Sequence, residues 1–241
     1  MIRKVIGEAI GKAMKSLIEV FFQPGKLFAE LPERRAAWVV PLIANTILLV
    51  ASTVFTVHVM GMDLIMRQRM ASSSMNPEQM QKAMEQATTP FATYATYAAV
   101  AVFTPISMLV VAGALFAFGM MTSRSPKFGS MLAMVNISFF PYFLVTVLMT
   151  ALVMAAAPDK TALDINNLLA TNVAAFVNKS ETSKGVYSLF TSLDLLSFIE
   201  IGLLSFGFSK LTKAGFAAGL GAVGGLWVLY VAAKMGMSLF Q

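Results

Sequence analysis

Two acidic residues within an apolar stretch are the first candidates for chemistry in this sequence. Asp194 and Glu200 lie in LDLLSFIEIGLLSFG, residues 193–207. A charged side chain at the centre of a bilayer costs about 2.5 kcal/mol or more unless it is paired, hydrated or neutralised. Each carboxyl group therefore needs a partner or a function.

A count of depth along the apolar stretches groups Glu200 with two amides. At about 1.5 Å of rise per residue, Glu200 lies about 14 Å from the inner end of its helix, near the depth of Asn136 and Asn45. We expect these three residues to form a buried polar layer, with Glu200 facing the interior and either protonated or hydrogen-bonded. Three interpretations stay open. The layer is a proton or cation site, or it is a structural polar contact, or Glu200 lies at the membrane interface because its helix begins late.

The same count places a second polar cluster toward the outer edge. Asp194, Lys234 and His58 lie at similar heights in three apolar stretches. Because a short hairpin joins the stretches that carry Asp194 and Lys234, the sequence predicts a contact between these two side chains.

The residues needed for common catalytic centres are missing. The chain has no Cys and one His, which excludes thiolate chemistry and disfavours a histidine metal site or a catalytic triad. It has no Gly-rich phosphate loop and no pair of aspartates on two apolar stretches. We therefore expect no catalytic residue, no cofactor and no metal.

The methionines leave a copper(I) site open as an alternative to the absence of a metal. Met62, Met66 and Met70 share a helical face, and thioethers are soft ligands that suit copper(I). A helix that rests on a membrane needs an apolar face in any case, and Met is frequent throughout the chain. The competing hypothesis is therefore simple apolar packing.

Composition predicts the elements that position these residues. Of the 241 residues, 57% are hydrophobic and only 12% are charged. About 20 apolar residues suffice to cross a bilayer as a helix. The predicted fold is an all-α polytopic membrane protein, a bundle of five transmembrane helices at residues 38–60, 91–121, 128–157, 186–209 and 215–239.

The amino-terminal segment differs from these spans. Residues 1–22 place apolar side chains at helical spacing opposite Lys and Glu, which is typical of an amphipathic helix. We expect this helix to lie on the membrane surface or, alternatively, to pack against the end of the bundle. Residues 1–37 then form a cytoplasmic interfacial segment, and residues 38–241 form the five-helix domain.

Basic residues predict the orientation. With the amino terminus in the cytoplasm, eleven Lys and Arg residues fall on the inner side, including Arg34 and Arg35 before Trp38, and six fall on the outer side. Topology thus explains the net charge of +6 better than nucleic-acid binding does. The carboxyl terminus is expected outside.

Both outer loops show helical patterns. In the first, Asn76 can cap a helix that starts at Pro77, with Gln79 reaching back to the cap. In the second, residues 163–177 carry apolar side chains at helical spacing. Glycines of the fifth span, such as Gly219 and Gly221, predict close packing against the fourth span or between two protomers.

The start of the first span and the last two spans carry a resemblance to a known family. FFQPGKLFAELPERRAAWVVPLI, the Asp194 that opens the fourth span, Gly207 and Lys213-Ala214 resemble the YIP family, and in particular its bacterial members. These multispanning membrane proteins are named in eukaryotes for interaction with Ypt/Rab GTPases. Glu200 departs from the family pattern, in which Phe and Trp follow the Asp closely.

The resemblance implies a non-enzymatic protein with a cytoplasmic amino-terminal segment and five helices. Eukaryotic members act as adaptors in vesicle trafficking, and some bacterial members look like accessory subunits of export systems. The expected function is therefore an adaptor, scaffold or accessory subunit of a membrane complex, in the inner membrane of a bacterium. The alternative is a small transporter or channel built around Glu200 and Asn136. The expected partners are the bilayer and a membrane protein, with the oligomeric state left open.

Overall fold

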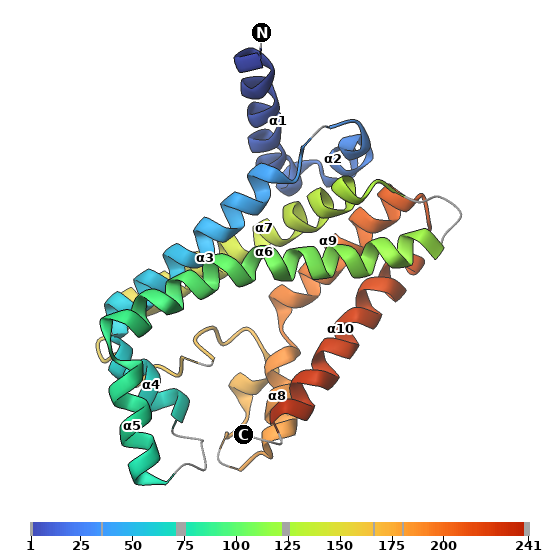
Figure 1. Ribbon diagram of the computed structural model, residues 1–241. Helices are drawn as coiled ribbons and strands as arrows, with labels where there is room; N and C mark the ends of the chain where they lie inside the picture. The colour runs from blue at the N-terminus through green and yellow to red at the C-terminus, as the bar shows by residue number, and fades with distance from the viewer. Residues whose placement is uncertain are drawn as a thin grey trace. The chain divides into compact units, whose positions relative to one another are not determined.

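The computed structural model describes residues 2–34, 36–70, 76–121, 126–165, 167–179 and 181–238. In these ranges the chain forms α-helices and two short 3₁₀-helices, with no β-strand (Figure 1). Five helices are long and apolar enough to cross a membrane, as predicted. They are α3 (Val39–Met60), α6 (Pro90–Met121), α7 (Phe128–Ala156), α9 (Leu195–Thr212) and α10 (Phe216–Ser238).

Further helices precede and connect these spans. The amino-terminal segment contains α1 (Ile2–Phe22), α2 (Pro24–Glu30) and the 3₁₀-helix η1 (Leu31–Glu33). Pro24 begins α2, a position where the missing backbone N–H removes no helical hydrogen bond. The connections between spans contain α4 (Met62–Met70), α5 (Pro77–Ala87), η2 (Val173–Phe176) and α8 (Lys184–Ser192).

The chain divides into two compact units. Unit 1 comprises Met1–Ile47, Phe103–Leu144 and Leu196–Tyr230. Unit 2 comprises Leu48–Val102, Val145–Leu195 and Val231–Gln241. The buried polar candidates Asn45, Asn136 and Glu200 therefore belong to unit 1, and the outer candidates Asp194, Lys234 and His58 belong to unit 2.

The first half of α7 is the centre of unit 1. Residues 130–138 are all buried, so this part of the helix contacts protein on every side. Segments of all five spans contribute to the surrounding core, together with α2. The core includes Leu42, Met108, Ala112, Leu115, Leu204, Phe208, Ala222 and Val223 around α7, and Leu27, Phe28 and Leu31 from the amino-terminal segment.

One glycine allows α9 and α10 to approach closely. A Cβ atom at Gly219 would lie 2.3 Å from the backbone oxygen of Ser205. No side chain fits at that distance, so the packing of the last two spans requires glycine at this position. A Cβ at Gly221 would meet no described atom within 4 Å, and Gly219 is therefore the glycine that carries the predicted hairpin packing.

The helix predicted in the first outer loop is present in unit 2 as α5. Asn76 accepts a hydrogen bond from the backbone N–H of Gln79 at 2.8 Å, and the Gln79 side chain accepts one from the Asn76 N–H, which completes a capping box. This local signal sets the start of α5.

The helix predicted at residues 163–177 is wrong. Among the described residues, only Val173–Phe176 are helical there, as the 3₁₀-helix η2. Some backbone groups of this loop close short turns, such as Asn167 N–H with the carbonyl of Asp164, and others bond to distant partners. Ile165 N–H donates to the Gln68 side chain, and Val173 N–H donates to the carbonyl of Leu193.

The fourth span also differs from its prediction. The expected helix over residues 186–209 is interrupted at Leu193 and Asp194, which separate α8 from α9. Leu195 N–H donates to the carbonyl of Thr171, and Asn172 pairs with Asp194 in an isolated antiparallel bridge. Asp194 therefore lies just before the apolar helix and not inside it.

Candidate functional site

Asn45 of α3 and Asn136 of α7 form a polar contact in the core of unit 1. Both residues are completely buried. The Asn45 side-chain N–H group donates to the backbone oxygen of Asn136 at 2.8 Å, while the Asn136 side chain donates to the carbonyl of Leu132 in its own helix at 2.8 Å. Asn45 thus fixes α3 against α7.

The side-chain oxygens of these two amides have no donor among the described residues. Asn45 Oδ1 and Asn136 Oδ1 are both buried without a hydrogen bond. Leaving a buried acceptor unsatisfied costs about 1–3 kcal/mol. These oxygens are available to a proton donor, a water molecule or a cation.

Glu200 is the third member of the predicted layer. It is 9% exposed and lies on the buried face of α9, as the sequence predicts. It forms no hydrogen bond or ion pair within the described part of the chain, including with Asn45 and Asn136. The structure therefore joins the two amides directly and leaves Glu200 as a separate buried carboxyl group of the same unit.

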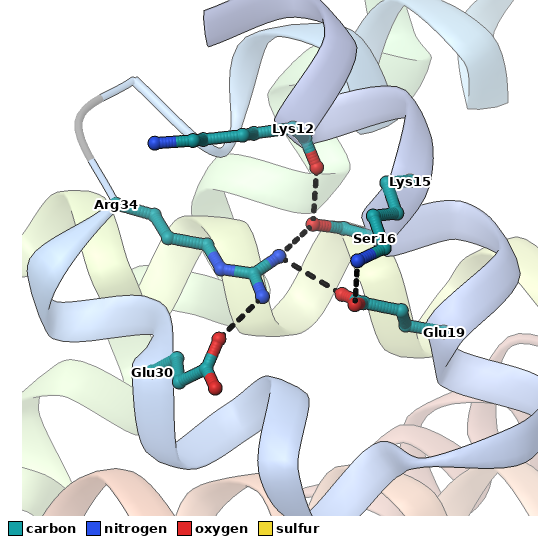
Figure 2. A network of polar contacts seen from close by, with 6 residues as sticks. All are labelled: Lys12, Lys15, Ser16, Glu19, Glu30 and Arg34. Carbon is teal, nitrogen blue, oxygen red and sulfur yellow. Dashed lines mark hydrogen bonds and ion pairs between the residues drawn. The ribbon is translucent and has the colours of Figure 1, made fainter.

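A second polar network holds the amino-terminal segment of unit 1 together (Figure 2). Arg34 is at its centre: Nη1 donates to Ser16 Oγ at 2.7 Å and to Glu19 Oε2 at 3.0 Å, and Nη2 donates to Glu30 Oε2 at 2.7 Å. Lys15 adds an ion pair to Glu19 at 3.3 Å. One guanidinium group thereby links α1, α2 and the residues that lead into α3. We call these residues the Arg34 hub.

The electrostatics of the hub follow from these contacts. Partial burial of Arg34 acts to lower its pKa, but the hydrogen bonds to Glu30 and Glu19 outweigh it, and the pKa is raised. The hydrogen bond from Arg34 is the main cause that lowers the pKa of Glu30 below 4.5. Both shifts favour the ionised forms of Arg34 and Glu30 at neutral pH.

The hub positions an apolar stripe on α1. Ala13, Ser16 and Val20 are buried against unit 1. Met14, Ile18 and Phe22, on the opposite face of the helix, are 59%, 63% and 79% exposed. An exposed stripe of large apolar side chains on a helix that is fixed in place indicates a surface that something else covers.

The outer cluster of unit 2 is arranged differently from the prediction. Lys234 donates to the hydroxyl oxygens of Thr191 at 2.9 Å and Ser192 at 3.0 Å, and not to the Asp194 carboxylate. Asp194 accepts a hydrogen bond from the Thr171 hydroxyl. His58 is exposed. Lys234 thus fixes α10 to the end of α8, while Asp194 fixes the second outer loop to the start of α9.

The methionines of the first outer loop lie in an apolar environment. Met62 is buried, and Met66 packs against a cluster of Met60, Ile65 and Met154. No group of three His, Cys, Asp or Glu side chains suited to a metal occurs in the described ranges. This packing is what the apolar interpretation predicts, and copper binding stays an untested hypothesis.

Sequence reasoning missed the Arg34 hub. Glu30 and Arg34 are four residues apart, a spacing that indicates an ion pair on one face of a helix. Nothing in the sequence shows that Ser16 and Glu19 reach the same guanidinium group. Arg35, the other member of the predicted basic pair, lies outside the described residues.

Comparisons of the chain with known protein families, with curated proteins and with solved structures give no match.

Proposed function

We propose that this protein organises a protein partner in the membrane, as a non-enzymatic adaptor, scaffold or accessory subunit of an export or trafficking complex. Five apolar helices make it an integral, multi-pass membrane protein. The resemblance to the YIP family supports the adaptor function and a bacterial inner membrane. The excess of basic residues on one side supports a cytoplasmic amino terminus.

The observation that carries this proposal is the exposed stripe of Met14, Ile18 and Phe22 on a helix that the Arg34 hub holds in place. A fixed surface loses little conformational entropy when a partner binds. Lys15, three residues before Ile18 and with a side chain that is 72% exposed, lies beside the stripe and favours an acidic surface on the partner. We place the partner on this face of α1.

A photocrosslinking amino acid at Ile18 tests the partner surface in native membranes. We expect an adduct with one protein that also co-purifies in stoichiometric amount, and we expect Ile18→Glu to abolish that co-purification. The same crosslinker at the buried Ala13 is the control and should give no intermolecular adduct. Adducts with lipid alone at Ile18 would contradict the adaptor proposal.

A second candidate function rests on Glu200. A buried carboxyl group with no partner among the described residues, in the same unit as two unsatisfied amide oxygens, favours a proton or cation site. The alternative is therefore a small transporter or channel. Flux of protons or cations in liposomes that is abolished by Glu200→Gln would support it, and unchanged flux in that variant would exclude the site.

A further inference from the structure

A cavity in unit 2 combines a cation, hydroxyl groups and an apolar wall. Its volume is about 170 Å³. Ser52 and Thr56 of α3, Thr96 of α6 and the exposed Arg69 of α4 form the polar part of its lining. The apolar wall is formed by Met62, Ile65, Met66, Ile165 and Leu168.

Tertiary contacts fix the apolar wall in place. Gln68 of α4 donates to the backbone oxygen of Leu163 at 2.7 Å and accepts from the backbone N–H of Ile165 at 3.0 Å. These two hydrogen bonds join α4 to the second outer loop, directly beside residues that line the cavity. Ile65 is buried within the apolar cluster around Met154. The cavity is therefore preformed.

Arg69 is the group that gives the cavity its charge. Among the described residues it forms no ion pair. Its neighbour Arg67, in contrast, pairs with Asp63 at 2.7 Å and does not line the cavity. A guanidinium group presents donors in a planar fork that matches the oxygens of a phosphate. Arg69 is free to bind such a group.

The hydroxyl groups of the lining are further candidate donors. Thr53 and Thr96 donate to carbonyl oxygens of their own helices. Ser52 and Thr56 make no such bond within the described part of the chain, so their hydroxyl protons remain available. An anion in the cavity would have both these hydroxyls and Arg69 as donors.

The Met60 end of α3 marks the boundary between headgroups and acyl chains, and the two hydroxyl groups lie inside that boundary. Thr56 and Ser52 lie four and eight residues before Met60, which is about 6 and 12 Å along the helix axis. The 22 residues of α3 span about 33 Å, close to the thickness of a hydrocarbon core. A phosphate held near this end of α3 would leave its acyl chains beside the apolar wall.

We propose that the cavity binds the phosphate group of a phospholipid. Arg69, Ser52 and Thr56 bind the phosphate, and the apolar wall contacts the acyl chain. Soluble phosphate shares the polar chemistry, but it would leave the apolar wall without a partner. The proposal is independent of the partner surface on α1.

Native mass spectrometry of the purified protein in detergent tests this proposal by measuring which lipids stay bound. The probe is phosphatidylglycerol, and diacylglycerol with the same acyl chains is the control that lacks phosphate. We expect retention of phosphatidylglycerol over diacylglycerol, and at least tenfold weaker binding in Arg69→Gln. Arg67→Gln is the matched control and should bind as the unchanged protein does.

Further variants separate binding from folding. Arg69→Lys should bind with intermediate affinity because it keeps the charge and loses the fork, and Thr56→Val should weaken binding without removing a charge. Unfolding temperatures of all variants identify any loss of fold. Equal binding by Arg69→Gln and the unchanged protein, or equal retention of the two lipids, would overturn the proposal. Binding of inorganic phosphate that depends on Arg69, without preference for the lipid, would overturn the lipid as ligand.

Discussion

At the scale of single residues, Arg34 does more than any other side chain to fix the amino-terminal segment. Its three hydrogen bonds reach Ser16, Glu19 and Glu30 across two helices. The guanidinium group is 16% exposed, and the Glu19 carboxylate is 15% exposed, so neither is fully solvated. Removing one partner of such a network leaves the other groups poorly satisfied.

Arg34→Gln should therefore destabilise the protein by about 1–3 kcal/mol. The matched control is Arg67→Gln, which removes an exposed ion pair with Asp63 and should change stability by less than about 1 kcal/mol. Thermal unfolding of both variants in detergent measures the difference. Equal stability of the two variants would show that the hub contributes nothing beyond an ordinary surface pair.

The hub also predicts a response to acid. The pKa of Glu30 is lower in the folded protein than its ordinary value of 4.5, so the stabilisation from this pair is complete above that pH and is lost as the pH falls through the folded value. Trp38 follows the hub and packs against the core of unit 1, so its fluorescence can report the change. In a Trp227→Phe background, we expect an acid transition that Arg34→Gln removes. An identical transition in both proteins would exclude Glu30 as its source.

Residue types identified the buried polar positions but not all of their partners. The low polarity of the spans made Glu200, Asn136 and Asn45 conspicuous, and the structure buries all three. Lys234 bonds to hydroxyl groups at the end of α8 and not to the expected carboxylate. The sequence did not show this because the predicted fourth span is interrupted between α8 and α9. The Arg34 hub joins positions up to 18 residues apart, and only the turn between α1 and α2 brings them together.

At the scale of elements, the sequence predicts the helices that neighbouring residues determine. It does not predict the segments whose conformation depends on distant backbone contacts. The capping box at Asn76 and the long apolar runs are properties of neighbouring residues, and the corresponding helices are present. The second outer loop has a helical apolar pattern, but its backbone bonds to Gln68 and to the residues around Asp194. A pattern within one segment carries no information on such partners.

The packing of α9 on α10 gives a prediction for a single methyl group. Gly219→Ala should destabilise the protein by about 1–3 kcal/mol or more, because the added Cβ meets a backbone oxygen that no side-chain rotation can move. Gly221→Ala is the control, since nothing described lies within 4 Å of its Cβ position. It should be neutral or stabilise the helix by about 0.5–1 kcal/mol. Thermal unfolding compares the two, and equal losses would refute this explanation of the contact.

At the scale of the whole molecule, the proposed orientation puts the first outer loop and the α9–α10 hairpin on opposite sides of the membrane. The absence of Cys makes single-cysteine labelling free of background. In cells, a membrane-impermeant maleimide should label Gln81→Cys in α5 and should label Lys210→Cys near the α9–α10 hairpin only after the membrane is opened. The reverse pattern would overturn the proposed orientation.

The all-round burial of residues 130–138 has a consequence for biosynthesis. Met134 of this segment packs against Gly207, yet α9 begins at Leu195 and leaves the ribosome several seconds later, at about 5–20 residues per second. Until then, part of α7, including the amide of Asn136, lacks its final protein neighbours and faces either lipid or the insertion machinery. We therefore expect α7 to need a temporary cover during membrane insertion, and variants that delay α9 should expose the chain to membrane proteases during synthesis.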